Sequence, residues 1–249
     1  MEKWVLAAKR ADFQEIGRKY GIDPVIARII RNRDITEDAE INRYLNGTLD
    51  DIPSWKSLKD IDKAVEIISQ KIDLGTRMRI IGDYDIDGVT ATYILLKGFK
   101  RLGANVDTYI PDRIADGYGI HNHLIKKAKE DGVDTIVTCD NGISAADQIA
   151  FAKKMGMTVV VTDHHEVPFE DTEEGRKYKL PLADAIINPK QSDCTYPNKN
   201  ICGAVVAMKL VFALYEKYGI PESEKEDYLE PAAIATVGDI MDLQGENRI

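Results

Sequence analysis

Three aspartates stand at alternate positions in this chain: Asp83, Asp85 and Asp87. They directly follow the short apolar run 78–81. Carboxylates this close together repel one another unless a positive charge lies among them. The chain already has surplus negative charge, because 33 basic side chains stand against 42 acidic ones, a formal net charge of −9. We therefore expect these aspartates to hold a divalent metal ion at the carboxyl end of a strand, where open α/β sheets place their ligands.

The spacing of these aspartates also matches the opening of an EF-hand calcium loop. Counted from Asp83, the twelfth position of such a loop is Ile94, where a bidentate glutamate is required. The preceding segment is also strand-like, whereas an EF-hand loop follows a helix. These two observations exclude a calcium loop, and a solvated acidic turn remains the alternative to a metal site.

A second acidic cluster contains Asp140 and follows the apolar run 135–137. Asp140, Asn141 and Gly142 by themselves form an ordinary turn sequence. If this run is another strand of a parallel sheet, Asp140 lies at the same edge of the sheet as the first cluster. We therefore expect Asp140 to converge on Asp83.

The third cluster is Asp163, His164 and His165, which comes directly after the apolar run 157–162. A single histidine in this position would more often be a cap or a core residue. Two adjacent histidines after an aspartate, again at the end of a buried strand, point instead to a binding site. Imidazole together with carboxylate suits Mn²⁺ or similar divalent ions better than Ca²⁺.

One more carboxylate stands at the end of the helical pattern 226–238. Asp239 could join the site from there, and Asp242 is the rival residue at the same end. Spacing alone does not separate a metal ligand from an acid at the end of a helix, so both interpretations stay open.

Short β-branched runs alternate with helical patterns after residue 78, whereas the earlier part of the chain is helical throughout. This alternation predicts an α/β fold with a mostly parallel sheet flanked by helices and preceded by a helical N-terminal segment. The strands are expected at 79–81, 106–110, 135–139, 157–162 and 183–187, and the helices of this part at 89–102, 122–131, 144–155, 202–218 and 226–238.

Composition bounds the class of protein. The chain has 249 residues, 44% of them apolar, and contains no apolar run long enough to span a membrane. Its three cysteines form no C-x-x-C pair, so a cytoplasmic, reduced protein is expected. No P-loop, G-x-G-x-x-G or G-x-S-x-G sequence is present, which argues against P-loop nucleotide hydrolysis, dinucleotide binding and α/β-hydrolase chemistry.

Taken together, the clusters resemble the motifs of the DHH phosphoesterase superfamily, and within it the RecJ-type single-strand-specific exonucleases. The resemblance rests on residues 82–91, 139–144 and 162–166 in this order, and connecting segments at 111–120, 187–190 and 203–209 are also similar. Family II pyrophosphatases and small phosphodiesterases of the superfamily typically have a histidine ahead of the first motif, and none precedes Asp83 here.

The resemblance implies two divalent metal ions, Mn²⁺ or Mg²⁺, bound by the acidic and histidine clusters. We expect Asp83 and Asp85 to bind directly, and Asp87 to be either a third ligand or a brace for the turn. The resemblance further implies that Asp140 bridges the ions and acts in catalysis, and that His164 and Asp239 complete the second site.

Two residues of the third cluster have implied roles beside the metal ions. His165 would face the scissile phosphate, and Asp163 would orient the two histidines. Arg113, Lys190 and Lys209 are candidates to hold backbone phosphates of the substrate.

The activity implied is hydrolysis of single-stranded DNA from its 5′ end, releasing 5′-mononucleotides in DNA repair and recombination. Candidate protein partners are a single-strand-binding protein and a helicase, and no membrane partner is expected. Two alternatives stay open: a phosphodiesterase or pyrophosphatase acting on small molecules or oligonucleotides, and a non-catalytic replication scaffold.

The expected domain organisation is a helical segment over 1–75, packed on the core, and a DHH catalytic domain over 76–249. RecJ-like enzymes continue into a DHH-associated substrate-binding domain and usually an OB-fold. We expect both of these domains to be absent from this chain.

Overall fold

The computed structural model describes residues 3, 9–172 and 175–249, so residues 1–2 and 4–8 of the expected helical segment lie outside the described part. The chain divides into two compact units. The larger is Ser54–Asp242, and the smaller joins the chain up to Pro53 with Leu243–Ile249. This division differs from the boundary expected at residue 75. The helix α4 (Ile61–Asp73) belongs to the larger unit because its buried face packs against other helices of that unit.

The smaller unit is a small helical assembly. Its core is formed by three buried isoleucines, Ile30, Ile35 and Ile41, with tyrosine and leucine side chains around them. Gly21 ends the first helix in the left-handed conformation, which glycine adopts without steric cost. The elements are α1 (Phe13–Tyr20), α2 (Pro24–Asn32), α3 (Asp38–Asn46), η1 (Leu49–Asp51) and η4 (Gly245–Arg248).

The larger unit is built on a five-stranded sheet in which all pairings are parallel. The strands lie in the order β2-β1-β3-β4-β7, so the strands that precede the three predicted motifs are neighbours at its centre. Their bounds are β1 (Met78–Ile81), β2 (Val106–Tyr109), β3 (Thr135–Cys139), β4 (Thr158–Thr162) and β7 (Ala185–Ile187).

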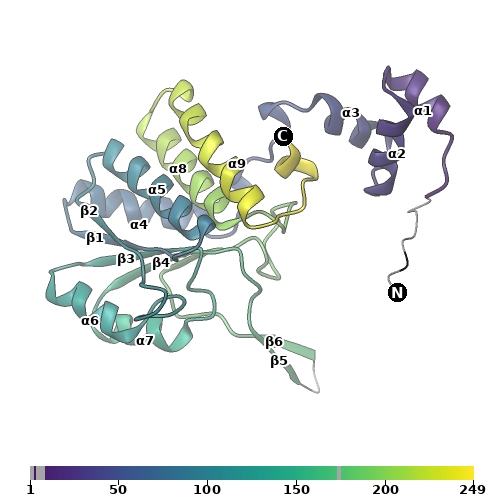
Figure 1. Cartoon of the computed structure of the whole chain (residues 1–249). Coiled ribbons are helices and arrows are strands. Elements are labelled where there is room, and N and C mark those ends of the chain that lie inside the picture. Colours follow the sequence, from purple (N-terminus) through teal and green to yellow (C-terminus); the bar gives the residue numbers. More distant parts are fainter. Residues whose placement is uncertain (1–2, 4–8, 173–174) are drawn as a thin grey trace. The chain divides into compact units, whose positions relative to one another are not determined.

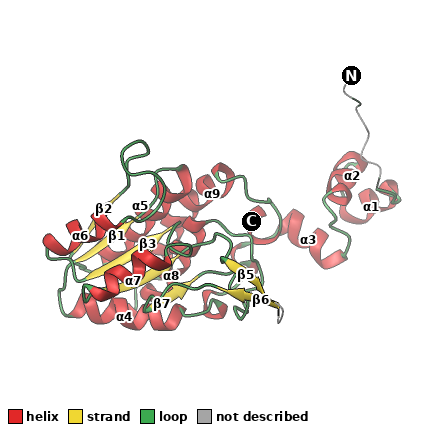
Figure 2. Cartoon of the chain, turned by 90° about the horizontal axis from the view of Figure 1, so that it is seen from below, coloured by secondary structure: helices red, strands yellow, loops and turns green. Residues whose placement is uncertain are grey.

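Helices cover both faces of this sheet (Figures 1 and 2). Successive residues of a strand point to opposite faces, and in β1 Ile80 joins the core on one face whereas Ile81 joins the core on the other. This explains why the central strands read as continuous apolar runs. One face carries α4, α5 (Ile86–Arg101), α8 (Gly203–Tyr218) and α9 (Leu229–Gly238), and the other carries α6 (Asn122–Glu130) and α7 (Ala146–Lys154).

The predicted fold class is confirmed, and the strand and helix positions differ from the expected ones by a few residues at most. One pair of strands was not predicted: β5 (Phe169–Thr172) and β6 (Gly175–Tyr178) form a separate antiparallel ribbon. Its sequence is dominated by charged residues and has no apolar run, so it carries no strand signal. A short 3-10 helix, η3 (Glu222–Tyr228), also precedes α9, which therefore begins later than expected.

Among the described residues, no helix combines the length and the apolar character that a membrane crossing requires. All three cysteines are free and buried.

Candidate metal centre

The three predicted motifs lie at the carboxyl ends of three neighbouring parallel strands. Asp83 follows β1, Asp140 follows β3, and His164 follows β4. Since parallel strands end at the same edge of a sheet, their terminal residues are brought together. The predicted convergence of Asp140 on Asp83 is confirmed, because carboxylate oxygens of Asp83, Asp85 and Asp140 lie within 4.8 Å of one another.

The three aspartates of the first motif have different surroundings. Asp83 is buried, and its Oδ1 makes no hydrogen bond to any described residue. Asp85 is exposed and caps the start of α5, where its Oδ1 accepts a hydrogen bond of 2.9 Å from the Gly88 N–H. The chain changes from strand to helix within the motif, so the three carboxylates stand in different backbone environments.

Asp87, in the first turn of α5, connects the motif to the start of α8. Its two carboxylate oxygens accept hydrogen bonds from the backbone N–H groups of Gly203 (2.6 Å) and Ala204 (2.8 Å). These donors are unpaired within α8, and a negative charge at a helix N-terminus is favourable. Its Oδ2 also lies 3.5 Å from Nε2 of His164. Asp87 therefore braces α8 and reaches the histidine cluster with the same carboxylate.

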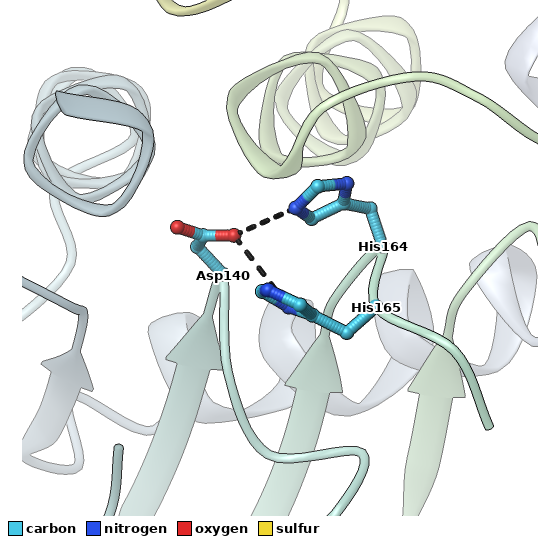
Figure 3. A group of neighbouring side chains, drawn as sticks. All are labelled: Asp140, His164 and His165. Carbon is cyan, nitrogen blue, oxygen red and sulfur yellow. Dashed lines mark ion pairs between the residues drawn. The ribbon is translucent and has the colours of Figure 1, made fainter. Parts of the chain in front are cut away.

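Asp140 lies at the centre of the cluster. Its backbone has φ +60°, a left-handed conformation that is uncommon outside glycine. Its Oδ1 is 3.1 Å from Nε2 of His164 and 3.9 Å from Nδ1 of His165 (Figure 3). The start of α8 approaches so closely that a Cβ on Gly203 would lie 2.8 Å from both Cβ and Oδ1 of Asp140. A glycine at 203 is therefore required for this packing.

His164 is buried, and neither of its ring nitrogens makes a hydrogen bond within the described part of the chain. Its Nε2 faces three carboxylates, since Oδ2 of Asp239 lies 3.6 Å away in addition to Asp87 and Asp140. Asp239 caps the C-terminus of α9, and its Oδ2 is a further buried atom without a hydrogen bond in the described chain. Its rival Asp242 is exposed and belongs to none of the donor groups found among the described residues.

Asp163 is fully hydrogen-bonded, in contrast to its neighbours. Its Oδ1 accepts hydrogen bonds from Nδ1 of His165 (2.8 Å) and from the backbone N–H of His164 (2.7 Å), and its Oδ2 accepts one from the N–H of Ile143 (2.9 Å). Burial acts to raise the pKa of Asp163, but these hydrogen bonds outweigh it and lower the pKa overall. The same bond raises the pKa of His165, whose ring is partly exposed.

The potential metal ligands fall into overlapping groups, and within each group the ligand atoms lie within 4.8 Å of one another. Asp140 occurs in two of them, and so does His164. A single carboxylate and a single imidazole thus connect the two sides of the cluster. The groups are Asp83, Asp85 and Asp140; Asp87, His164 and Asp239; and Asp140, His164 and His165.

The electrostatics of the cluster are unfavourable for the protein alone. Burial raises the pKa of Asp83 and Asp239, and burial together with the charge of Asp87 raises the pKa of Asp140 well above its usual range. Burial also lowers the pKa of His164, which favours the neutral imidazole that binds metals. Buried polar atoms without partners are costly. Oxygen and imidazole donors in this arrangement fit Mn²⁺ or Mg²⁺.

The three cationic residues expected to contact phosphate differ in position. Arg113 is exposed, and its guanidinium carbon lies 5.3 Å from the centre of the Tyr84 ring, within the first motif. Nζ of Lys190 is 3.0 Å from a carboxylate oxygen of Glu166, the residue after the histidines. Both lie beside the cluster.

Lys209 is buried, which argues against its expected phosphate contact. Its exposed fraction is only 2%, because α8 is buried on almost every side. Its ammonium lies over the ring of Tyr196, 5.0 Å from the ring centre. Helical spacing alone does not distinguish a residue on a surface helix from one on a helix within the core.

The residue that sequence reasoning missed is Tyr118. Its hydroxyl lies 3.3 Å from the backbone oxygen of Asp140 and 3.4 Å from Nδ1 of His165. Burial raises the pKa of Tyr118, so the phenol stays protonated. Gly117 and Gly119 have φ of +78° and +79°, and the Gly-Tyr-Gly sequence was the available signal, since two such glycines turn the loop toward the site.

The fold and the site together define an α/β protein that gathers oxygen and nitrogen donors for divalent cations at the carboxyl edge of a parallel sheet. The chain belongs to the DHH family, because the model described as "DHH family, N-terminal domain" matches residues 77–236. The resemblance to RecJ-type proteins is also confirmed. The chain is 37% identical over 238 residues to the single-stranded-DNA-specific exonuclease RecJ of Salmonella typhimurium, and the match covers 92% of this chain.

Solved structures agree with this assignment. A crystal structure of exonuclease RecJ bound to manganese is 32% identical, with a TM-score of 0.69, and the match covers 81% of this chain and 47% of that one. RecJ from Thermus thermophilus in complex with Mn²⁺ is 28% identical, with a TM-score of 0.70 over 95% of this chain and 31% of that one. The chain spans 39% of the Salmonella protein, so it corresponds to well under half of that relative.

Proposed function

We propose that this chain carries the catalytic part of a metal-dependent exonuclease that hydrolyses single-stranded DNA from the 5′ end and releases 5′-mononucleotides. The similarity to proteins named single-stranded-DNA-specific exonuclease supports this proposal. Catalysis is assigned to the DHH domain, expected over 76–249, and the biological setting is DNA repair and recombination. The polarity of cleavage rests on the family resemblance. The buried free thiols support a cytoplasmic location.

The observation that carries the proposal is the pair of donor groups connected through Asp140 and His164. Asp140 belongs to the group that contains Asp83 and Asp85, and its Oδ1 lies 3.1 Å from Nε2 of His164 in the other group. Buried ligand atoms without hydrogen bonds occur on both sides. Burying carboxylates without partners costs free energy, and bound cations would offset that cost.

Two divalent cations, Mn²⁺ or Mg²⁺, would be held by these residues. Asp83, Asp85 and Asp140 would hold one, and Asp87, His164 and Asp239 the other, with Asp140 between them. When bound, such ions polarise a phosphate oxygen, lower the pKa of a water and offset charge on the attacking and leaving oxygens. Structures of the relatives named for bound Mn²⁺ and Mg²⁺ support these choices of ion.

The side chains around the cations have separate tasks in this proposal. His165 donates a hydrogen bond to the scissile phosphate, because its raised pKa favours the protonated ring and its side chain is 43% exposed. Asp163 holds the orientation of that ring through Nδ1. Arg113 and Lys190, beside the cluster, bind neighbouring phosphates of the strand.

Two other functions compete with this one. A phosphodiesterase or pyrophosphatase for small molecules would need the same cations but no contacts to a polymer. A replication scaffold would need neither. The intact donor groups argue against the scaffold, and single-stranded DNA remains the proposed partner of the site.

The test is a side-by-side assay of this chain with Mn²⁺. Single-stranded DNA labelled at its 5′ end, duplex DNA, pyrophosphate and a cyclic dinucleotide are incubated at matched concentrations. We expect early release of labelled mononucleotide from the single strand and little turnover of the others. Faster turnover of pyrophosphate or of the cyclic dinucleotide would replace the proposal with the small-molecule alternative. A protein that binds no Mn²⁺ by calorimetry would support the scaffold.

A further inference from the structure

The ribbon formed by β5 and β6 has no role in the site described above. Phe169 pairs with Tyr178 across the two strands, and the ribbon is a two-stranded sheet of its own in the described part of the chain. Every residue of both strands is exposed. Figures 1 and 2 show the two strands projecting from the main body of the larger unit. An isolated two-stranded ribbon is marginally stable in water.

One face of this ribbon carries aromatic side chains. Residues opposite each other share a face, which places Phe169, Tyr178, Asp171 and Arg176 on the same side. The ring centres of Phe169 and Tyr178 are 6.1 Å apart and meet edge to face. The guanidinium carbon of Arg176 lies 4.4 Å from the Phe169 ring centre. The two aromatic residues nevertheless remain 43% and 42% exposed, so their mutual contact leaves much of both rings uncovered.

The base of the ribbon lies close to the histidine cluster. Phe169 is four residues after His165, so their Cα atoms are no more than about 15 Å apart. Val167, between them, is buried in the core on the α6 and α7 side of the sheet. The backbone N–H of Lys179 donates a hydrogen bond of 2.7 Å to the oxygen of Pro168, which closes the base of the ribbon. The aromatic pair is therefore anchored to the segment that carries the site.

The charges of the ribbon are largely paired within it. Arg176 lies 3.6 Å from Asp171, and Lys179 forms an ion pair with Glu170. Because these positive charges have acidic neighbours, the ribbon offers little net attraction to a phosphate backbone. Aromatic rings and guanidinium planes are the groups on which unpaired nucleobases stack, and the two rings of the ribbon remain partly exposed.

We propose that the aromatic face of the β5–β6 ribbon, formed by Phe169, Tyr178 and Arg176, is a stacking site for a base of a single-stranded nucleic acid whose phosphates reach the metal centre. This inference rests on the proposed function, and it adds a contact that a small phosphate ester cannot make. Stacking accepts every base, so the site favours single strands over duplexes without selecting a sequence. A duplex keeps its bases stacked on one another and cannot use this face.

The experiment measures binding of a fluorescent oligothymidylate in EDTA, where hydrolysis cannot occur, at low and at high salt. The test variant is Phe169→Val with Tyr178→Val, because valine keeps the preference for strands but has no π face. We expect at least about 5-fold weaker binding, the same at both salt concentrations, since stacking releases no counterions. Tyr178→Phe, which retains the ring, should bind like the unaltered protein.

Two controls separate stacking from damage. Lys177→Gln changes the opposite face of the ribbon and should leave the affinity for oligothymidylate within about 2-fold, an order-of-magnitude limit for an exposed charge. Hydrolysis of the p-nitrophenyl ester of thymidine 5′-phosphate with Mn²⁺, which has a single base and cannot span both sites, should be unaffected in the valine variant. Circular dichroism and thermal unfolding establish that the larger unit keeps its fold.

Unchanged binding by the valine variant overturns the proposal, and so does a loss that disappears at high salt, because the contact is then electrostatic. Loss of ester hydrolysis together with binding also overturns it, since the ribbon then supports the site instead of binding a base. Failure of the proposed function looks different. The unaltered protein would bind oligothymidylate through the ribbon yet hydrolyse none of it with Mn²⁺.

Discussion

Two clusters of charged residues lie along the same parallel sheet, and they differ in how their charges are neutralised. Arg79 of β1 binds Asp107 of β2 through two hydrogen bonds of 2.6 and 2.8 Å, and it binds Asp131 at 3.0 Å. Arg77 donates a further bond of 2.7 Å to Asp107. At the carboxyl end of β1 and β3, by contrast, Asp83 and Asp140 keep carboxylate oxygens without any hydrogen bond in the described chain.

The pKa directions express the same difference. Burial acts to raise the pKa of Asp107, but the hydrogen bonds from Arg79 and Arg77 prevail and lower it. Burial raises the pKa of Asp83 and Asp140, and neighbouring carboxylates raise it further. The first group supplies its own counter-charges and serves the stability of the sheet. The second group lacks such counter-charges, as expected of a site that binds cations from solution.

Asp140→Asn is the substitution expected to have the largest effect, and it tests whether the second cluster binds cations. The substitution keeps the size of the side chain but removes the charge shared by both donor groups. We expect DNA hydrolysis with Mn²⁺ to fall at least about 1,000-fold, because several kcal/mol of transition-state stabilisation depend on the ions. Calorimetry should detect weaker Mn²⁺ binding. Activity within about 10-fold of the unaltered protein would show that the donor groups are not the catalytic site.

The group that supplies its own counter-charges is tested by Arg79→Met, which removes the buried guanidinium that Asp107 and Asp131 share. We expect the free energy of unfolding to fall by about 3 kcal/mol, because removing one partner from a partly buried ion-pair network is strongly destabilising. Arg77 and Lys127 stay beside the two carboxylates. Mn²⁺ binding should be retained. The matched control is Lys217→Met, which breaks an exposed pair with Glu66 at 2.7 Å and should cost less than about 1 kcal/mol. Equal losses in urea unfolding would contradict the comparison.

A smaller effect is expected from Asn141, which connects the two strands that carry Asp83 and Asp140. Its side-chain amide donates hydrogen bonds to the backbone oxygens of Ile81 (3.1 Å) and Cys139 (2.9 Å). Asn141→Ala should weaken Mn²⁺ binding about 10- to 100-fold, because residues that orient metal ligands contribute effects of this size.

Gln191 offers a matched control for Asn141. It is a buried amide that bridges the oxygens of Ile186 and Asn188 after β7, and it is not part of any donor group found in the described chain. Gln191→Ala should reduce thermal stability to a similar extent but leave Mn²⁺ affinity unchanged in calorimetry. If both variants lose affinity equally, Asn141 acts through general stability and not through the positions of Asp83 and Asp140.

A pH dependence of stability in EDTA is expected as well. The pKa of Asp140 is raised above its unfolded value of 3.8, so the folded state binds more protons above about pH 4. Stability from this group therefore falls as the pH rises, by at most about 1.4 kcal/mol per pH unit. Asp107 has the opposite sign, since its lowered pKa gives stability that is lost only as the pH falls below about 4.

Asp140→Asn should flatten the decline in stability between about pH 5 and pH 8 and raise the stability of the metal-free protein at about pH 8. Urea unfolding at a series of pH values measures both effects. A variant with the same slope as the unaltered protein would show that Asp140 does not carry an unfavourable charge in the folded state.

Much of the fold was predictable because its strands are buried on both faces. Residues 135–139 and 158–162 read as strands from their apolar, β-branched content, and they lie where the pattern placed them. The β5–β6 ribbon was not predictable, because it buries no apolar face and its strands are held by local pairing. Charged residues in a ribbon and charged residues in a loop look alike in a sequence.

The site was predictable in composition and less so in arrangement. The motifs identified the acidic and histidine residues that gather at one edge of the sheet, although Asp239 could be preferred to Asp242 only after the fold was known. Asp87 could not be assigned beforehand. It stands in the first turn of α5, so its direction depends on how α5 packs against the start of α8. The expected phosphate contact of Lys209 has a similar weakness, because the burial of α8 is a property of the assembled core.

The sequence by itself therefore determined which chemical groups this protein brings together, since each motif follows a strand and parallel strands end at one edge. It also determined that the groups are too acidic to stay close without cations. Only the tertiary structure decided how Asp83, Asp85 and Asp87 divide between two donor groups, and that Tyr118 lies beside Asp140 and His165. Side-chain direction and burial depend on contacts between distant segments, and those contacts form only when the helices pack on the sheet.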